Sequence, residues 1–136
     1  MSDRILCTIE NGVADVRMNR PDKKNALTAD MYQALADALD EAAQTPSIRA
    51  TLILGVPGAF TAGNDIGDFL KTAMSGNRGS NAVFDFLERL IMAKKPVVAG
   101  VEEPDGGVRR GELREELVED LLPRGRVDHR RVGHDA

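Results

Sequence analysis

One stretch of sequence decides the fold, Thr51-Leu-Ile-Leu-Gly-Val-Pro-Gly-Ala-Phe-Thr-Ala-Gly-Asn-Asp-Ile-Gly-Asp-Phe69. Its apolar beginning, residues 50–54, predicts a buried strand, and the glycines and proline of residues 55–58 predict a turn. The small residues that follow allow a ligand to approach the backbone closely. A helix predicted over residues 66–73 leaves N–H groups unpaired at its start. Such a loop can hold an oxyanion, or a carbonyl oxygen that gains charge during a reaction.

Two kinds of phosphate-binding loop can be tested against this stretch. Gly58 and Gly63 have the spacing of the glycines in a P-loop, but Asn64 and Asp65 stand where that motif requires a lysine and a hydroxyl residue. No Gly-x-Gly-x-x-Gly motif occurs in the chain, so the dinucleotide-binding fingerprint is absent. The loop therefore does not belong to either class of nucleotide-binding protein.

The rest of the chain alternates strands and helices. The turn signal Asn11-Gly12 separates two alternating segments and predicts a β-hairpin of strands 5–10 and 13–18. Helical spacing predicts a helix over residues 29–44, capped by Thr28, and a second helix over residues 81–93. A buried strand is predicted over residues 96–101. The order hairpin, helix, strand predicts an α/β fold.

Side-chain spacing also predicts the core. The first helix is expected to bury one face, which consists of Met31, Leu35, Ala38, Leu39 and Ala42. The second helix is expected to bury Val83, Leu87, Leu90 and Ile91. Its Phe84 and Phe86 could belong to the core or to the wall of a pocket, and the core is the preferred prediction. The single cysteine, Cys7, alternates with apolar neighbours and is expected to be a buried, inert thiol.

Composition narrows the class of protein. The 136 residues fit one domain with a core of useful size. A net charge of −4 argues against nucleic acid or an anionic membrane as the main partner. One cysteine excludes an internal disulfide framework, and no apolar run reaches the length of a membrane span. No signal peptide opens the chain, so a cytoplasmic location is expected.

The loop and two further stretches resemble a known family. Phe60-Thr61-Ala62-Gly63-Asn64-Asp65-Ile66 is similar to the first acyl-CoA loop of the enoyl-CoA hydratase/isomerase (crotonase) family. Asn64-Asp65, in place of Ala-Asp, is similar to its isomerase-like branch. The segments 19–27, with Asn-Arg-Pro and Asn-Ala-Leu, and 94–101, Lys-Lys-Pro-Val-Val-Ala-Gly-Val, also resemble the family pattern. The resemblance covers residues 5–101, the N-terminal half of the family.

This resemblance implies a fold and a set of site residues. The fold would be the N-terminal portion of a crotonase-like ββα spiral, and the substrate an acyl-CoA thioester, with no other cofactor and no metal. The backbone N–H of Asn64 would be the first donor to the thioester oxygen, and Lys23 and Lys24 would lie beside the CoA nucleotide. The complete predicted CoA-binding set is Lys23, Lys24, Ala26, Ala62, Gly63, Asn64, Asp65 and Ile66. The Asn64 side chain is expected to cap the helix that follows.

The resemblance ends at Val101, where the composition changes. Residues 102–136 contain 17 charged residues, and all seven basic ones are arginine. We therefore predict two units, residues 1–101 and a divergent charged tail of residues 102–136, derived from a frame change or a truncated paralogue. Within the tail, residues 112–122 could form an amphipathic helix and residues 123–136 are expected to be disordered. The spacing of His129 and His134 does not predict a metal site.

The tail lacks the carboxylates that the family uses for acid–base chemistry. Glu102, Glu103 and Glu112 have no context that would raise their pKa values or aim them at a pocket, and are expected to be solvated. The sequence therefore predicts a hydratase or isomerase relative with little or no activity as this chain. Two alternatives remain: a non-catalytic CoA-binding fragment or partner of an intact paralogue, and an unrelated α/β binding domain. The resemblance would allow a homotrimer or hexamer if the fold were complete.

Overall fold

The computed structural model describes residues 3–76 and 82–102. Within these ranges, four strands form one sheet in the order β1-β2-β3-β4. The strands are β1 (Ile5–Glu10), β2 (Val13–Met18), β3 (Ala50–Leu54) and β4 (Val97–Gly100). The predicted helix over residues 112–122, the predicted disorder over 123–136 and both histidines lie outside the described residues.

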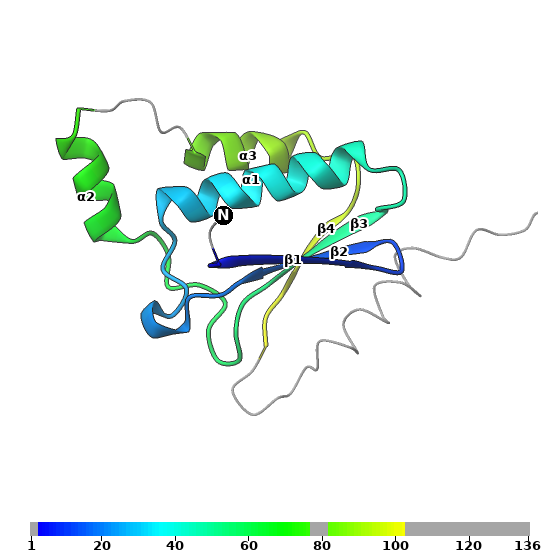
Figure 1. Cartoon of the computed structure of the whole chain (residues 1–136), viewed down its shortest axis with the longest axis horizontal. Coiled ribbons are helices and arrows are strands. Elements are labelled where there is room, and N and C mark those ends of the chain that lie inside the picture. Colours follow the sequence, from blue (N-terminus) through cyan, green and yellow to red (C-terminus); the bar gives the residue numbers. More distant parts are fainter. Residues whose placement is uncertain (1–2, 77–81, 103–136) are drawn as a thin grey trace, which may run out of the picture.

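The sheet combines a hairpin with parallel strands. β1 and β2 are antiparallel, and Asn11 and Gly12 form the turn between them with positive φ angles of 52° and 78°. β2, β3 and β4 are parallel, so each connection between them crosses over through helices. Figure 1 shows α1 and α3 lying together over one face of the sheet. The predicted α/β fold is confirmed.

Helix α1 (Ala29–Gln44) is the main element packed on this face. Thr28 caps it, because its side-chain oxygen accepts a hydrogen bond from the N–H of Met31 at 3.3 Å. All five predicted core residues of α1 are buried. They pack against the helix-facing residues of the sheet, including Val16, Met18 and Ile53. The opposite face of the sheet carries a second buried cluster, Val13, Ala50, Leu52 and Leu54.

The two other helices are less deeply packed. They are α2 (Ile66–Met74), which Figure 1 shows standing apart from the sheet, and α3 (Ala82–Ile91). In α3, Phe86 and Leu90 point inward, but Leu87 is 44% exposed, Ile91 82% and Phe84 70%. The prediction that these last three belong to the core is wrong. The apolar residues of α3 lie on two faces of the helix, and α1 covers only one of these faces.

The environment of Cys7 also differs from the prediction. Its thiol is exposed and free, because β1 is the edge strand and only Ile5 of that strand is buried. Partial burial, and then the charge of Glu41 on α1, raise the pKa of the Cys7 thiol. Within the part of the chain described here, no helix is both long and apolar enough to cross a membrane.

Candidate functional site

The predicted loop begins with a tight turn after β3. The backbone of Val56 and Ala59 forms a two-way hydrogen-bonded bridge, with both N···O distances at 3.0 Å. A side chain at Gly55 would meet the oxygen of Ala59 at 2.4 Å and the Cα of Phe60 at 2.5 Å. Glycine is therefore required at position 55 for steric reasons, because residues 59 and 60 pass so close to its backbone that no Cβ fits.

A buried amide holds the turn from the other side. Asn25 is 0% exposed, and its side-chain Nδ2 donates hydrogen bonds to the carbonyl oxygens of Ala59 and Phe60, both at 3.1 Å. Its Oδ1 accepts from the N–H of Arg20 at 2.7 Å. Asn25 also has a φ of 56°, a conformation that asparagine tolerates better than most residues. The sequence did not predict this role of Asn25, because a polar residue between a loop and a helix gives no signal that it is buried.

The segments around Lys24 and Gly63 lie side by side as a short ladder. The N–H of Ala62 donates to the oxygen of Lys24 at 2.9 Å. Leu27 then makes two bonds of 2.8 Å, donating to the oxygen of Gly63 and accepting from the N–H of Asp65. The predicted site residues from the two stretches are thus brought together by backbone hydrogen bonds, although almost 40 positions separate them.

Asn64 occupies the middle of this ladder. Because the oxygen of Gly63 and the N–H of Asp65 both point toward Leu27, the N–H of Asn64 points to the opposite side. Within residues 3–76 and 82–102, this N–H makes no hydrogen bond, and Asn64 is exposed. The amide is therefore available to an external acceptor.

The helix cap is not the predicted one. Asp65 caps α2, because its Oδ1 accepts from the N–H of Asp68 at 3.0 Å. The Oδ1 of Asn64 instead accepts a hydrogen bond of 2.5 Å from the hydroxyl of Tyr32, on the first turn of α1. The sequence could not reveal this pairing, because it joins residues 32 positions apart.

Charged groups tie the loop to its surroundings. Arg20 donates to the Oδ2 of Asp65 at 2.7 Å and to the oxygen of Ala26 at 2.9 Å. The hydrogen bond from the Asp68 N–H, and then that from Arg20, lower the pKa of the Asp65 carboxyl. The Oδ2 of Asp68 accepts from the N–H of Ala29 at 2.8 Å, at the start of α1. Both acids near the loop thus make structural hydrogen bonds of the kind expected at helix starts.

The other predicted CoA-binding residues lie around the ladder. Lys23 ends a 3₁₀ turn, Pro21–Lys23, and Lys24 follows it with a φ of 49°. Both lysine side chains are exposed, Ala62 and Gly63 are exposed, and Ile66 is 74% exposed. Ala26 is half-buried, with its carbonyl oxygen bound to Arg20. Apart from Ala26 and Asp65, the predicted residues are therefore exposed, and the side chain of Asp65 is directed into its ion pair with Arg20.

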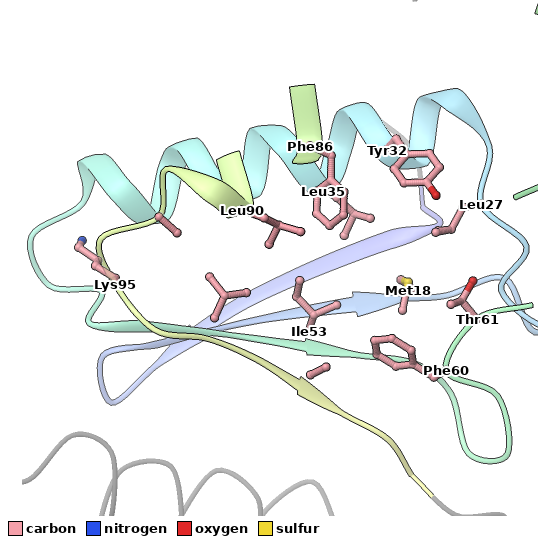
Figure 2. Close-up of a pocket in the computed structure, with 13 residues that line it drawn as sticks. Met18, Leu27, Tyr32, Leu35, Ile53, Phe60, Thr61, Phe86, Leu90 and Lys95 are labelled. Atoms are coloured by element: carbon pink, nitrogen blue, oxygen red, sulfur yellow. The ribbon is translucent and has the colours of Figure 1, made fainter. Parts of the chain in front are cut away.

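An apolar cavity of about 570 Å³ lies beside the loop, between α1, α3 and the sheet. Figure 2 shows Phe60, Thr61 and Tyr32 at one end of it and Lys95 at the other. Most of its other lining residues are aliphatic, among them Leu27, Leu35, Ile53 and Leu90. The Nζ of Lys95 is engaged with the carbonyl oxygens of Ala42 and Thr45, at 2.6 and 2.9 Å. Asn64 does not line this cavity.

Glu102 corrects one expectation about the tail. Its carboxylate lies 3.1 Å from the guanidinium of Arg17, and its side chain is only 9% exposed. Arg17 also donates to the oxygen of Gly55, and the N–H of Gly58 donates to the oxygen of Glu102. The prediction that Glu102 is solvated is wrong, because its carboxylate pairs with Arg17 of β2 and its backbone oxygen is bonded to the turn after β3. Glu103 and Glu112 lie outside the described residues. Among the residues that the structure describes, no group of three or more His, Cys, Asp or Glu side chains could hold a metal ion.

Comparisons with known proteins point in one direction. The sequence model of a family described as enoyl-CoA hydratase/isomerase matches residues 8–107. Enoyl-CoA delta isomerase 2 of Rattus norvegicus is 35% identical over 113 residues, which are 79% of this chain and 28% of the relative.

Solved structures agree with the sequence relatives. Pseudomonas aeruginosa OdaA matches with a TM-score of 0.67 and 42% identity, over 74% of this chain and 40% of that one. An enoyl-CoA hydratase/isomerase from Pseudoalteromonas atlantica matches with a TM-score of 0.64 and 34% identity, over 71% of this chain and 37% of that one. The chain spans less than half the length of these relatives.

Proposed function

This chain belongs to the enoyl-CoA hydratase/isomerase family, and we propose that it binds an acyl-CoA thioester with the carbonyl oxygen at the backbone N–H of Asn64. The observation that supports this proposal is the state of that N–H. It belongs to an exposed residue and makes no hydrogen bond within the described residues, while the oxygen of Gly63 and the N–H of Asp65 are both bonded to Leu27. A fixed donor of this kind stabilises charge that develops on an oxygen during reaction.

The chemistry that such a donor supports is the formation of an enolate-like intermediate. When a proton leaves the carbon next to a thioester, or water adds to its double bond, negative charge moves onto the carbonyl oxygen. One backbone donor that is directed at this oxygen is typically worth about 2.7–4 kcal/mol of activation free energy. Hydration and double-bond isomerisation of enoyl-CoA thioesters both pass through this charge distribution.

The exposed lysines supply the second part of the proposed binding mode. Lys24 is joined to Ala62 of the loop by a backbone hydrogen bond and Lys23 precedes it, so both exposed lysines are neighbours of the loop. Two ammonium groups at the edge of the surface would attract the phosphates of CoA. Exposed charges act weakly and are screened by salt, so their contribution should fall as ionic strength rises.

Binding can be tested by calorimetric titration of the chain with crotonyl-CoA. Replacing both lysines by alanine should weaken the affinity about fivefold at low salt, and less at high salt. The control is the double variant of Lys71 and Lys94 to alanine, which removes the same charge elsewhere and should bind as the parent does. Equal affinities for the two double variants would show that Lys23 and Lys24 do not contribute to binding. Absence of binding by the parent chain would contradict the proposed function.

We propose further that the chain alone has little or no turnover. Asp65 and Asp68, the carboxylates near the loop, are both committed to helix starts and to partners in the fold. A general acid or base must instead reach the reacting proton and titrate near the working pH. Assays with crotonyl-CoA and with a 3-enoyl-CoA should give rates close to the uncatalysed reaction. A turnover number near the typical enzyme value of about 10 s⁻¹ would contradict this proposal.

A second function is favoured by the surfaces of α2 and α3, namely a non-catalytic CoA-binding partner of an intact paralogue. Leu70 and Met74 of α2 are 57% and 87% exposed, and α3 exposes Phe84 and Ile91. Apolar surfaces of this kind commonly mark interaction sites. Sedimentation would show whether the chain is a monomer, a trimer or a hexamer. Activity that appears only on mixing with the paralogue would favour the partner function, whereas activity of the chain alone would exclude a non-catalytic role.

A further inference from the structure

We propose that Tyr32 is a positioning residue, which holds the backbone N–H of Asn64 in the orientation that receives a thioester oxygen. This inference rests on the proposed function of that N–H. The hydroxyl of Tyr32 donates a hydrogen bond of 2.5 Å to the side-chain Oδ1 of Asn64. The phenol therefore restrains the same residue whose main-chain donor is in question, without occupying the donor itself.

The loop needs such a restraint. Gly63 has a φ of +92°, and no atom lies within 4 Å of the place where its Cβ would stand. Glycine rotates more freely than other residues, so hydrogen bonds, and not local sterics, must fix the peptide between Gly63 and Asn64. The ladder holds the oxygen of Gly63 and the N–H of Asp65 through Leu27. The hydrogen bond from the Tyr32 hydroxyl restrains Asn64, the residue between these two backbone groups.

Tyr32 is itself well placed to act as an anchor. It lies on the first turn of α1, which begins two residues after Leu27, and its own N–H donates to the oxygen of Thr28 at 3.1 Å. Its ring packs against Phe86 of α3, with centroids 5.8 Å apart and planes tilted by 54°. Burial raises the pKa of the Tyr32 hydroxyl, so it remains a protonated donor at neutral pH.

The pair also gives a reason for the residue type at position 64. The amide oxygen of asparagine accepts a hydrogen bond from a phenol, whereas an alanine at this position would offer no acceptor. Asn64 is exposed, and its side chain makes no other hydrogen bond within residues 3–76 and 82–102. The side chain thus serves the orientation of its own backbone by binding Tyr32.

The first test concerns the ligand-free chain and uses the variant Tyr32→Phe. This variant keeps the ring packed on Phe86 and removes only the hydroxyl. We expect the ¹⁵N order parameter of the Asn64 amide to fall, and Asn64→Ala to lower that of residue 64 by the same amount. The control is Thr45→Val, which removes a hydroxyl at the far end of α1, where it is bonded to Glu41. An unchanged order parameter in Tyr32→Phe would overturn the proposal.

The second test measures recognition of the carbonyl. The ratio of affinities for an acyl-CoA thioester and for its thioether analogue, which lacks the carbonyl oxygen, reports on the bond to the Asn64 amide. Tyr32→Phe should reduce this ratio about fivefold, the value of one typical hydrogen bond, and leave thioether affinity unchanged. In a double-mutant cycle, adding Asn64→Ala should cause no further loss.

The outcomes separate the two proposals. A parent chain that binds thioester and thioether equally would overturn the proposed function, and this inference with it. A parent chain that prefers the thioester, together with a Tyr32→Phe variant that prefers it equally, would overturn only the role of Tyr32. Loss of affinity for both ligands in Tyr32→Phe would indicate a merely structural residue and would also contradict the proposal.

Discussion

The junction between the loop and α1 differs sharply from the side of the molecule formed by α3 and β4. At the junction, Asn25, Arg20 and Asp65 join residues 20–28 to residues 59–68 through side-chain and backbone hydrogen bonds. At α3 and β4, apolar side chains such as Ile91 and Val101 are 82% and 54% exposed. The first region is held together by polar contacts, and the second presents apolar surface that it does not cover.

The difference shows where the specificity of the fold lies. Polar networks with every member satisfied fix one arrangement of the backbone, whereas apolar contacts tolerate many. The candidate site lies at the junction of the loop with α1, where hydrogen bonds fix the geometry of the backbone. The matched part of this chain covers 28% to 40% of the relatives named above, and α3 and β4 belong to the part of the fold with uncovered surface.

The largest effect is expected at the centre of the junction. Asn25→Ala removes three hydrogen bonds and leaves the oxygens of Ala59 and Phe60 without this donor. We expect a loss of about 3 kcal/mol in the free energy of unfolding, measured in urea. Asn19→Ala is the matched control, because the Asn19 side chain makes one exposed bond to Asp3, and it should cost about 0.5 kcal/mol or less. Similar losses of unfolding free energy in both variants would show that the hydrogen bonds of Asn25 do not specially stabilise the junction.

The turn after β3 should be nearly as sensitive. Gly55→Ala places a Cβ 2.4 Å from the oxygen of Ala59, so the backbone must shift, at a cost of about 2 kcal/mol. Gly67→Ala, on α2, meets only the Oδ1 of Asp65 at 3.3 Å and gains helix propensity of about 0.5–1 kcal/mol. Thermal unfolding should therefore shift in opposite directions for the two variants. A shift in the same direction would show that the turn is not sterically fixed.

The pH dependence of stability provides a test of the ion pair. The pKa of Asp65 is lowered from its ordinary value of 3.8, so its stabilising effect is complete above that value and is lost as the pH falls through the lower, folded-state pKa. The stability difference between the parent and Asp65→Asn should thus be largest near neutral pH and shrink in acid. Arg20→Gln should reduce the same acid-dependent loss. A difference that stays constant with pH would contradict the assignment.

The smallest effect is expected on α3. Ile91→Gln replaces a side chain that is 82% exposed, and should change the free energy of unfolding by no more than about 0.5 kcal/mol. The inward-facing Leu90, which lines the cavity, is the contrast within the same helix. Leu90→Ala should cost clearly more in a urea titration, because it enlarges an existing cavity. Equal costs would mean that the outer face of α3 is covered in solution.

The sequence predicted the elements that repeat a simple pattern. The hairpin, α1 with its Thr28 cap, and the buried strand β3 follow from alternation, helical spacing and turn residues. The loop was located because its small residues and its resemblance to a family coincide. Each of these signals is carried by residues that lie close together in the chain.

The errors concern properties set by distant residues. Phe84, Leu87 and Ile91 match a helical core face, but which face of an apolar helix is covered depends on α1. The partners of Asn64 and Glu102 are Tyr32 and Arg17, which are 32 and 85 positions away. No local pattern encodes such pairs, so they became visible only in three dimensions.

The central claim is that the N–H of Asn64 receives the oxygen of a thioester. The most direct measurement is the ¹H–¹⁵N spectrum of the chain with saturating acyl-CoA thioester, compared with the thioether analogue. The account predicts a downfield shift of the Asn64 amide proton with the thioester and little change at this residue with the thioether. An Asn64 signal that responds equally to both ligands, or that stays fixed while its neighbours move, would contradict the claim.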